Sequence, residues 1–197
     1  MSHEQSSIPV YKVILIGDAS VGKSSLIRRL LLDEFDEQYT ATVGVDLSAV
    51  ALNIEEVTPV ILTAIDLGGQ ADFDELRSKY YQGAHFACLV YDISDQHTFD
   101  RLEHWYRGLI ESVPSFESDS KLGMLLGNKS DLTNERKVSP IEGRRYASNI
   151  SWPFYETSAK TGHNVSEVFT RIAKTLYTKF PPHEVSASHS DRPNIGV

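Results

Sequence analysis

The residues from Gly17 to Ser24 have types and a spacing that could cradle a row of phosphates. They read Gly-Asp-Ala-Ser-Val-Gly-Lys-Ser and match the pattern G-x-x-x-x-G-K-[ST]. Glycines in such a loop let backbone N–H groups turn inward, and the start of the following helix adds positive potential. Lys23 would place a charge at the β- and γ-phosphates, and Ser24 a hydroxyl at Mg²⁺. The predicted phosphate contacts are Asp18, Ala19, Ser20, Val21, Gly22, Lys23, Ser24 and Ser25.

A second polar group follows the apolar run 60–65. Asp66 comes directly after this run, where a carboxylate can hold Mg²⁺ through water. The next residues are Leu-Gly-Gly-Gln, and the glycines would let the backbone at Gly69 approach a γ-phosphate. Gln70 can orient an attacking water, so Gln70 and Lys23 are the predicted catalytic residues. The alternative is an ordinary glycine turn with a solvated glutamine.

A third group would select the base. Asn128-Lys129-Ser130-Asp131 follows another apolar run, and the Asp131 carboxylate can accept hydrogen bonds from guanine N1–H and the exocyclic amine. Adenine lacks this donor pair, and a site that leaves the carboxylate unpaired would reject adenine by about 10⁴-fold or more. The stem of Lys129 can lie over the base, and Asn128 can tie this loop to the phosphate loop. Ser158-Ala159-Lys160 follows the last apolar run, and the N–H of Ala159 could donate to guanine O6.

The elements that would position these residues alternate along the chain. Continuous apolar runs predict buried strands, amphipathic stretches predict helices, and a short turn-like link predicts that the second and third strands form a hairpin. Ser139 and Thr98 are the predicted caps of two helices. The predicted strands are 10–16, 45–54, 60–67, 86–91, 122–126 and 154–157, and the predicted helices are 23–32, 98–112, 140–148 and 165–179.

This order predicts an α/β fold of the P-loop NTPase class. We expect a mostly parallel six-stranded sheet with one antiparallel strand and about five helices on its two faces. Ligands of such sheets lie at the carboxyl ends of the strands, where all three polar groups occur. We expect a flexible N-terminus at 1–9, one domain at 10–180 and a disordered tail at 181–197.

Composition limits the other possibilities. The chain has 197 residues and a formal net charge of −8, which argues against a nucleic-acid-binding face. No apolar stretch reaches the ~18 residues of a membrane span. The single cysteine, Cys88, lies inside an apolar run, so we expect it to be buried and the protein to be cytoplasmic.

Together, these motifs resemble those of the small GTPases of the Ras superfamily, over residues 10–179. The segment Thr42-Val43-Gly44-Val45-Asp46 resembles the first switch of the Rab branch. The resemblance implies that Thr42 binds Mg²⁺ and senses the γ-phosphate, that Tyr39 covers the phosphates, and that Phe35 packs against the edge of guanine. The resemblance therefore adds Thr42 to Ser24 and Asp66 as a metal ligand, with GTP or GDP as the bound nucleotide.

Other segments depart from the Rab pattern. Asp66-Leu67-Gly68-Gly69-Gln70 resembles the second switch of the Arf branch. Residue 2 is Ser2, whereas Arf proteins carry a myristoylated glycine there, and the chain lacks the C-terminal cysteine that Ras and Rab proteins prenylate. We expect no direct lipid anchor and contact with membranes only through a protein partner. In this the chain is similar to unanchored Rab-like proteins, including those of archaea.

The expected function is a monomeric switch that binds and slowly hydrolyses GTP, with a turnover on the order of 10⁻⁴ to 10⁻³ s⁻¹. Effectors, an exchange factor and an activating protein would bind through residues 35–46 and 67–81, in trafficking or signalling. The alternative is a nucleotide-loaded scaffold with negligible hydrolysis. A third possibility, a P-loop kinase or ATPase, is opposed by Asn128-Lys129-Ser130-Asp131.

Overall fold

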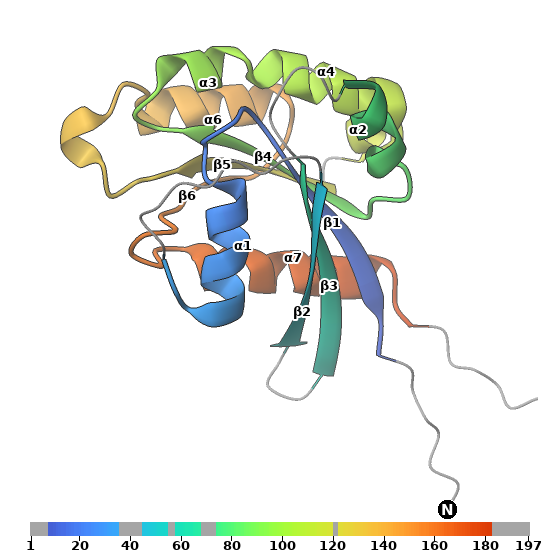
Figure 1. The fold of residues 1–197 in the computed structure, drawn as a ribbon. Coiled ribbons are helices and arrows are strands. Elements are labelled where there is room, and N and C mark those ends of the chain that lie inside the picture. Colours follow the sequence, from blue (N-terminus) through green and yellow to red (C-terminus); the bar gives the residue numbers. More distant parts are fainter. Residues whose placement is uncertain (1–7, 36–44, 55–57, 68–73, 120–121, 183–197) are drawn as a thin grey trace, which may run out of the picture.

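A six-stranded sheet forms the centre of the molecule. The computed structural model describes residues 8–35, 45–54, 58–67, 74–119 and 122–182 (Figure 1). The strands lie in the order β2-β3-β1-β4-β5-β6, with β2 antiparallel to β3 and all other neighbours parallel. This arrangement confirms the predicted sheet and its hairpin. The strands are β1 (Val10–Ile16), β2 (Val45–Ile54), β3 (Thr58–Leu67), β4 (Phe86–Asp92), β5 (Gly123–Asn128) and β6 (Phe154–Glu156).

Helices cover both faces of this sheet (Figure 1). Helices α1 (Lys23–Leu32) and α7 (Val165–Lys179) lie on one face. The opposite face carries α2 (Asp74–Tyr81), α3 (Gln96–Asp100), α4 (Leu102–Ser112), α5 (Ser115–Ser118) and α6 (Pro140–Asn149), and a 3-10 turn spans Thr133–Glu135. Among the helices in the described residues, none is both long and apolar enough to cross a membrane.

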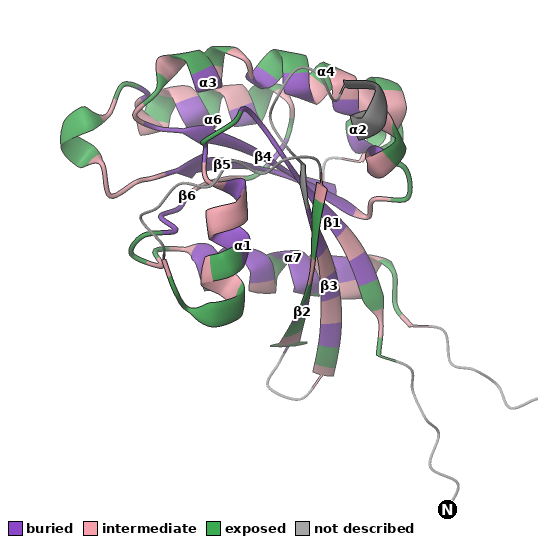
Figure 2. Ribbon diagram, viewed as in Figure 1, coloured by how far each residue is buried: buried purple, intermediate pink, exposed green. Residues whose placement is uncertain are grey.

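Two apolar clusters, one on each face, hold the layers together. The first joins β1, β3 and β4 to α1 and α7, and the second joins the other side of the sheet to α4 and α6. Every residue of β4 is buried, as expected for a central strand covered on both faces (Figure 2). Cys88 is one of these residues, as predicted, and burial raises the pKa of its thiol, which keeps it protonated.

The predicted helix over 98–112 is wrong at its start and in its middle. The chain begins α3 at Gln96, where the Asp95 side chain accepts from the backbone N–H of His97 at 3.1 Å. Thr98 is inside α3 and is not its cap, because its hydroxyl accepts from the backbone N–H of Asp92 at 3.0 Å. Arg101 then separates α3 from α4. Arg101 pairs there with Asp18, a contact between distant residues that the periodicity of the sequence does not contain.

At the edge where the site residues lie, β4 and β5 end later than predicted, whereas β6 ends at Glu156, one residue before its predicted end. Asp92 pairs with Asn128, so β4 and β5 extend past their apolar runs. By contrast, β1, β2, α1 and α7 have the predicted bounds, and Ser139 caps α6 in a capping box with Glu142. Helices α2 and α5 were not predicted. The two extended strands bring polar residues to the carboxyl edge of the sheet, where the predicted ligand site lies.

Candidate nucleotide-binding site

The loop between β1 and α1 is packed so closely that two of its positions require glycine. Gly17 has φ 145°, and a Cβ there would lie 2.1 Å from the carbonyl oxygen of Val90. Gly22 precedes α1 with φ 95°, and a Cβ there would lie 2.3 Å from Nδ2 of Asn128. Both angles are in the region that side chains disfavour. We call this loop, residues 17–22, the cradle. Its two glycines let it fit between β4 and the segment 128–131, which we call the base-selecting segment.

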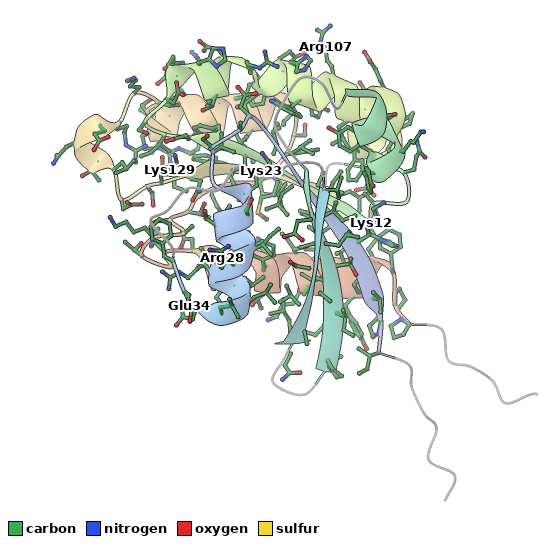
Figure 3. The ribbon with its side chains drawn as sticks, viewed as in Figure 1. Lys12, Lys23, Arg28, Glu34, Arg107 and Lys129 are labelled. Carbon is green, nitrogen blue, oxygen red and sulfur yellow. The ribbon has the colours of Figure 1, made fainter. Side chains whose placement is uncertain are left out.

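Lys23 closes the cradle from inside. Its side chain is buried, and Nζ donates to the carbonyl oxygens of Gly17 at 2.9 Å and Asp18 at 2.8 Å. The ammonium group therefore lies along the loop at the positive end of α1, as Figure 3 shows at the start of that helix. Ser24 and Ser25 follow in the first turn and are half-buried. A cation, a helix N-terminus and a hydroxyl are thus gathered at one point.

The Asp18 carboxylate lies away from the cradle. Its Oδ1 accepts from the indole Nε1–H of Trp105 at 2.7 Å and from Nε of Arg101 at 3.0 Å, while His97 Nδ1 lies 3.5 Å from Oδ2. The side chain of Asp18 therefore ties the cradle to α3 and α4, while its carbonyl oxygen accepts from Lys23. No motif in the sequence marks this tie, because Arg101 and Trp105 lie more than 80 positions from Asp18.

Replacing Trp105 with Phe tests this tie. We expect the variant to lose about 1–3 kcal/mol of stability beyond the packing loss, because a buried carboxylate loses a donor. Trp152→Phe is the matched control, since Trp152 is also buried but its Nε1 has no hydrogen-bond partner in the described structure. Denaturant unfolding and titration with GDP check it. Trp105→Phe should also weaken GDP binding, and equal effects of the two substitutions on both measurements would contradict the role of the indole N–H.

Asn128 joins the cradle to the base-selecting segment, as predicted. Its Nδ2 donates to the carbonyl oxygen of Val21 at 2.8 Å. Its Oδ1 accepts from the hydroxyl of Thr157 at 3.2 Å and from the backbone N–H of Ala159 at 3.4 Å. The side chain is fully buried, so each polar atom has a partner inside the protein. One amide group thereby fixes the distance between three loops.

The two charged residues of the same segment are also held by partners. Lys129 has φ 64°, and its Nζ forms an ion pair with Asp92 at 2.7 Å. Asp131 accepts from the hydroxyl of Ser158 at 2.5 Å. The Lys129 side chain remains 34% exposed. Asp92, which the sequence analysis did not single out, fixes the end of this side chain.

An ion pair supports the segment that leads into Ser158. Arg136 donates to both carboxylate oxygens of Glu156, at 2.6 Å and 2.9 Å, and this bond raises the pKa of the guanidinium. Asn164 Nδ2 donates to the carbonyl oxygen of Glu156 at 2.7 Å. The end of β6 is thus fixed from two sides. The 158–160 segment begins from a rigid support.

The remaining predicted site residues lie partly outside the described structure. Tyr39, Thr42, Gly69 and Gln70 are outside the described residues, and so is the side chain of Asp66. The backbone of Asp66 lies at the end of β3, in register with Leu15 of β1, directly beside the cradle strand. Two further predicted residues are described: Phe35 is half-buried against the cluster under α1 and α7, and Lys160 is exposed.

A comparison with protein families agrees with this geometry. The model of the Ras family matches residues 12–178, from β1 to the end of α7. The chain belongs to the Ras family. Ras-family proteins bind GTP and GDP, generally with Mg²⁺, so this chain is a GTP-binding protein of the small GTPase kind. The match includes the cradle, the segment after β3, the base-selecting segment and the 158–160 loop.

Proposed function

We propose that this Ras-family chain is a molecular switch that hydrolyses GTP to GDP and phosphate. The main support is the side chain of Asn128, which is hydrogen-bonded both to the cradle, at Val21, and to the 158–160 loop, at Ala159. A guanine nucleotide has a base and a phosphate chain at its two ends, and this bridge fixes the spacing of the protein groups suited to each. Figure 3 labels a lysine from each group, Lys23 and Lys129.

The base would be selected by Asp131. Ser158 donates to one oxygen of its carboxylate and so limits the rotation of that group. The charged acceptor can then receive the two donors on one edge of guanine, N1–H and the exocyclic amine. Ala159 would add a donor for O6, since its N–H meets Asn128 only at 3.4 Å and can be shared.

The phosphates would be bound by the main chain of the cradle and by Lys23. Mg²⁺ prefers oxygen ligands, and the Ser24 hydroxyl, the Thr42 hydroxyl and the Asp66 carboxylate fit that preference. Ser24 follows Lys23 in the first turn of α1, and the end of β3 lies next to β1, which supports this set. When bound, Mg²⁺ neutralises charge on the phosphate oxygens. Gln70 orients the water, and Lys23 holds the phosphates in line.

Partners would bind through residues 35–46 and 67–81. A bound γ-phosphate would order these two segments, and its loss would release them. We place the chain nearest the Rab branch, on the pattern from Thr42 to Asp46, with a second switch like that of Arf proteins. The competing function is a scaffold that holds nucleotide without hydrolysing it. Gln70 favours hydrolysis, whereas Gly68 and Ala71 leave the scaffold open, because Ras and Rab proteins carry other residues there.

Single-turnover hydrolysis of GTP separates the two functions. The wild type should hydrolyse GTP on the order of 10⁻⁴ to 10⁻³ s⁻¹, and Gln70→Leu should reduce this rate about tenfold or more, because the water loses its positioning group. GDP dissociation serves as the control and should not change. A wild-type rate equal to that of Gln70→Leu would instead support the scaffold.

A further inference from the structure

Arg29 makes a second connection, between α1, the helix that follows the cradle, and the 158–160 loop. Its Nε donates to the carbonyl oxygen of Ala159 and its Nη2 to that of Lys160, each at 2.7 Å. Its Nη1 donates to Asp33, at 2.6 Å to the carbonyl oxygen and 3.1 Å to Oδ1. The side chain is only 15% exposed. All three nitrogens of the guanidinium group are therefore engaged.

These bonds complete the restraint of Ala159. Its N–H faces Asn128 on one side, and its carbonyl oxygen is held by Arg29 on the other. The loop also closes on itself, because Ser158 accepts from the N–H of Thr161 at 3.1 Å through its hydroxyl and from that of Gly162 at 2.9 Å through its carbonyl oxygen. Arg29 adds to these local bonds two that come from outside the loop.

Arginine suits this place because its donors form a flat, rigid fork. Two adjacent carbonyl oxygens can be held at once, and the orientation of the peptide between them is fixed. Hydrogen bonds from a charged donor are also about twice as strong as neutral ones. Lysine offers a single nitrogen on a flexible stem, so it can hold one carbonyl oxygen but not the peptide plane.

Through Arg29, α1 connects the two ends of the site, the cradle and the 158–160 loop. The helix begins at Lys23, directly after the cradle, and its 10 residues span about 15 Å. Arg29 lies in its last turn, opposite the loop at Ala159. Asn128 connects the cradle and the loop at one point, and Arg29 connects them at another.

We propose that Arg29 is a positioning residue for guanine recognition, which orients the 158–160 loop toward the base without touching the nucleotide. This inference rests on the guanine-nucleotide site proposed above. The hydrogen bonds of Arg29 go to the loop and to Asp33 at the far end of α1. Its loss should therefore weaken the hold on the base and leave the hold on the phosphates intact. The preference for GDP over ADP is thus the quantity that this residue controls.

The test compares GDP and ADP binding to Arg29→Met by competition against a fluorescent GDP analogue. We expect the dissociation constant for GDP to rise about tenfold, as for the loss of one well-made hydrogen bond in the loop, and that for ADP to change less than twofold. Arg107→Met is the matched control, because Arg107 also pairs with a carboxylate four residues away, Glu103, and is bonded neither to Asn128 nor to the 158–160 loop in the described structure. It should leave both constants unchanged.

Arg29→Lys keeps the charge and the stem, and it decides the matter if Arg29→Met does not fold. We expect Arg29→Lys to recover part of the lost preference. If the folded Arg29→Met variant keeps the full preference for GDP over ADP, the inference is overturned and the proposed function stands. If only Arg29→Lys folds, a full preference in that variant has the same consequence. Equal losses for GDP and ADP overturn it too, since they indicate a general structural role. A wild type that binds GDP and ADP within tenfold of each other overturns the proposed function and this inference together.

Discussion

Asp131→Asn will lower the affinity for GTP by about a thousandfold, the loss expected for two hydrogen bonds to a charged acceptor. It will raise the affinity for xanthosine triphosphate. Xanthine carries a carbonyl where guanine carries its amine, so the asparagine NH₂ can donate to that oxygen while its carbonyl accepts from N1–H. The hydroxyl of Ser158 contacts this side chain in the wild type and can donate to the asparagine oxygen as well. Competition titrations with both triphosphates measure the exchange.

Asp100→Asn is the control for this substitution. Asp100 is an exposed aspartate that accepts from Gln96 at 3.0 Å within α3, and in the described structure it is bonded neither to the base-selecting segment nor to the 158–160 loop. The same change of a carboxylate to an amide there should alter neither affinity. GTP and ATP that bind the wild type within tenfold of each other would contradict the assignment of Asp131 to guanine.

The sequence predicts the sheet and the position of the site because these depend on local patterns. Apolar runs of β1 and β2 and the amphipathic pattern of α7 fix the bounds of those elements, and each polar motif directly follows a strand. The tie from Asn128 to the phosphate loop was also predictable, because its amide offers both a donor and an acceptor directly after a strand.

The supports of the site are less visible in the sequence. Arg29, Trp105 and Asp92 reach their partners across long separations or past the end of an apolar run, so no periodic pattern marks them. Arg29 looks like any solvent-facing residue of an amphipathic helix until the 158–160 loop is placed beside it. The residues that perform the chemistry follow from motifs, whereas those that hold them in place follow only from packing.

Lys23→Ala and Ser24→Asn should weaken nucleotide binding in different ways. Lys23 is buried, and its ammonium group donates to the carbonyl oxygens of Gly17 at 2.9 Å and Asp18 at 2.8 Å. It therefore lies in the loop that would hold the phosphates. Its loss removes a charge from GTP and GDP alike and leaves two carbonyl oxygens without this donor. We expect both affinities to fall about a hundredfold, the loss of a charge-assisted bond to phosphate.

Ser24→Asn acts on the metal, so its effect should depend on the nucleotide. The hydroxyl would help to hold Mg²⁺, which would neutralise charge on the phosphates, and GDP has no γ-phosphate. The affinity for Mg²⁺–GTP should therefore fall more than that for GDP, and titrations at several Mg²⁺ concentrations measure the difference.

Lys12→Ala is the control, because Lys12 also donates to a carbonyl oxygen, that of Gln82 at 2.6 Å, but its place on β1 is away from the cradle (Figure 3). Equal and small effects at Lys23 and Ser24 would mean that the loop from Gly17 to Ser24 serves only to connect β1 and α1. The difference between GTP and GDP is the stricter test, since a merely unfolded cradle would lose both nucleotides equally.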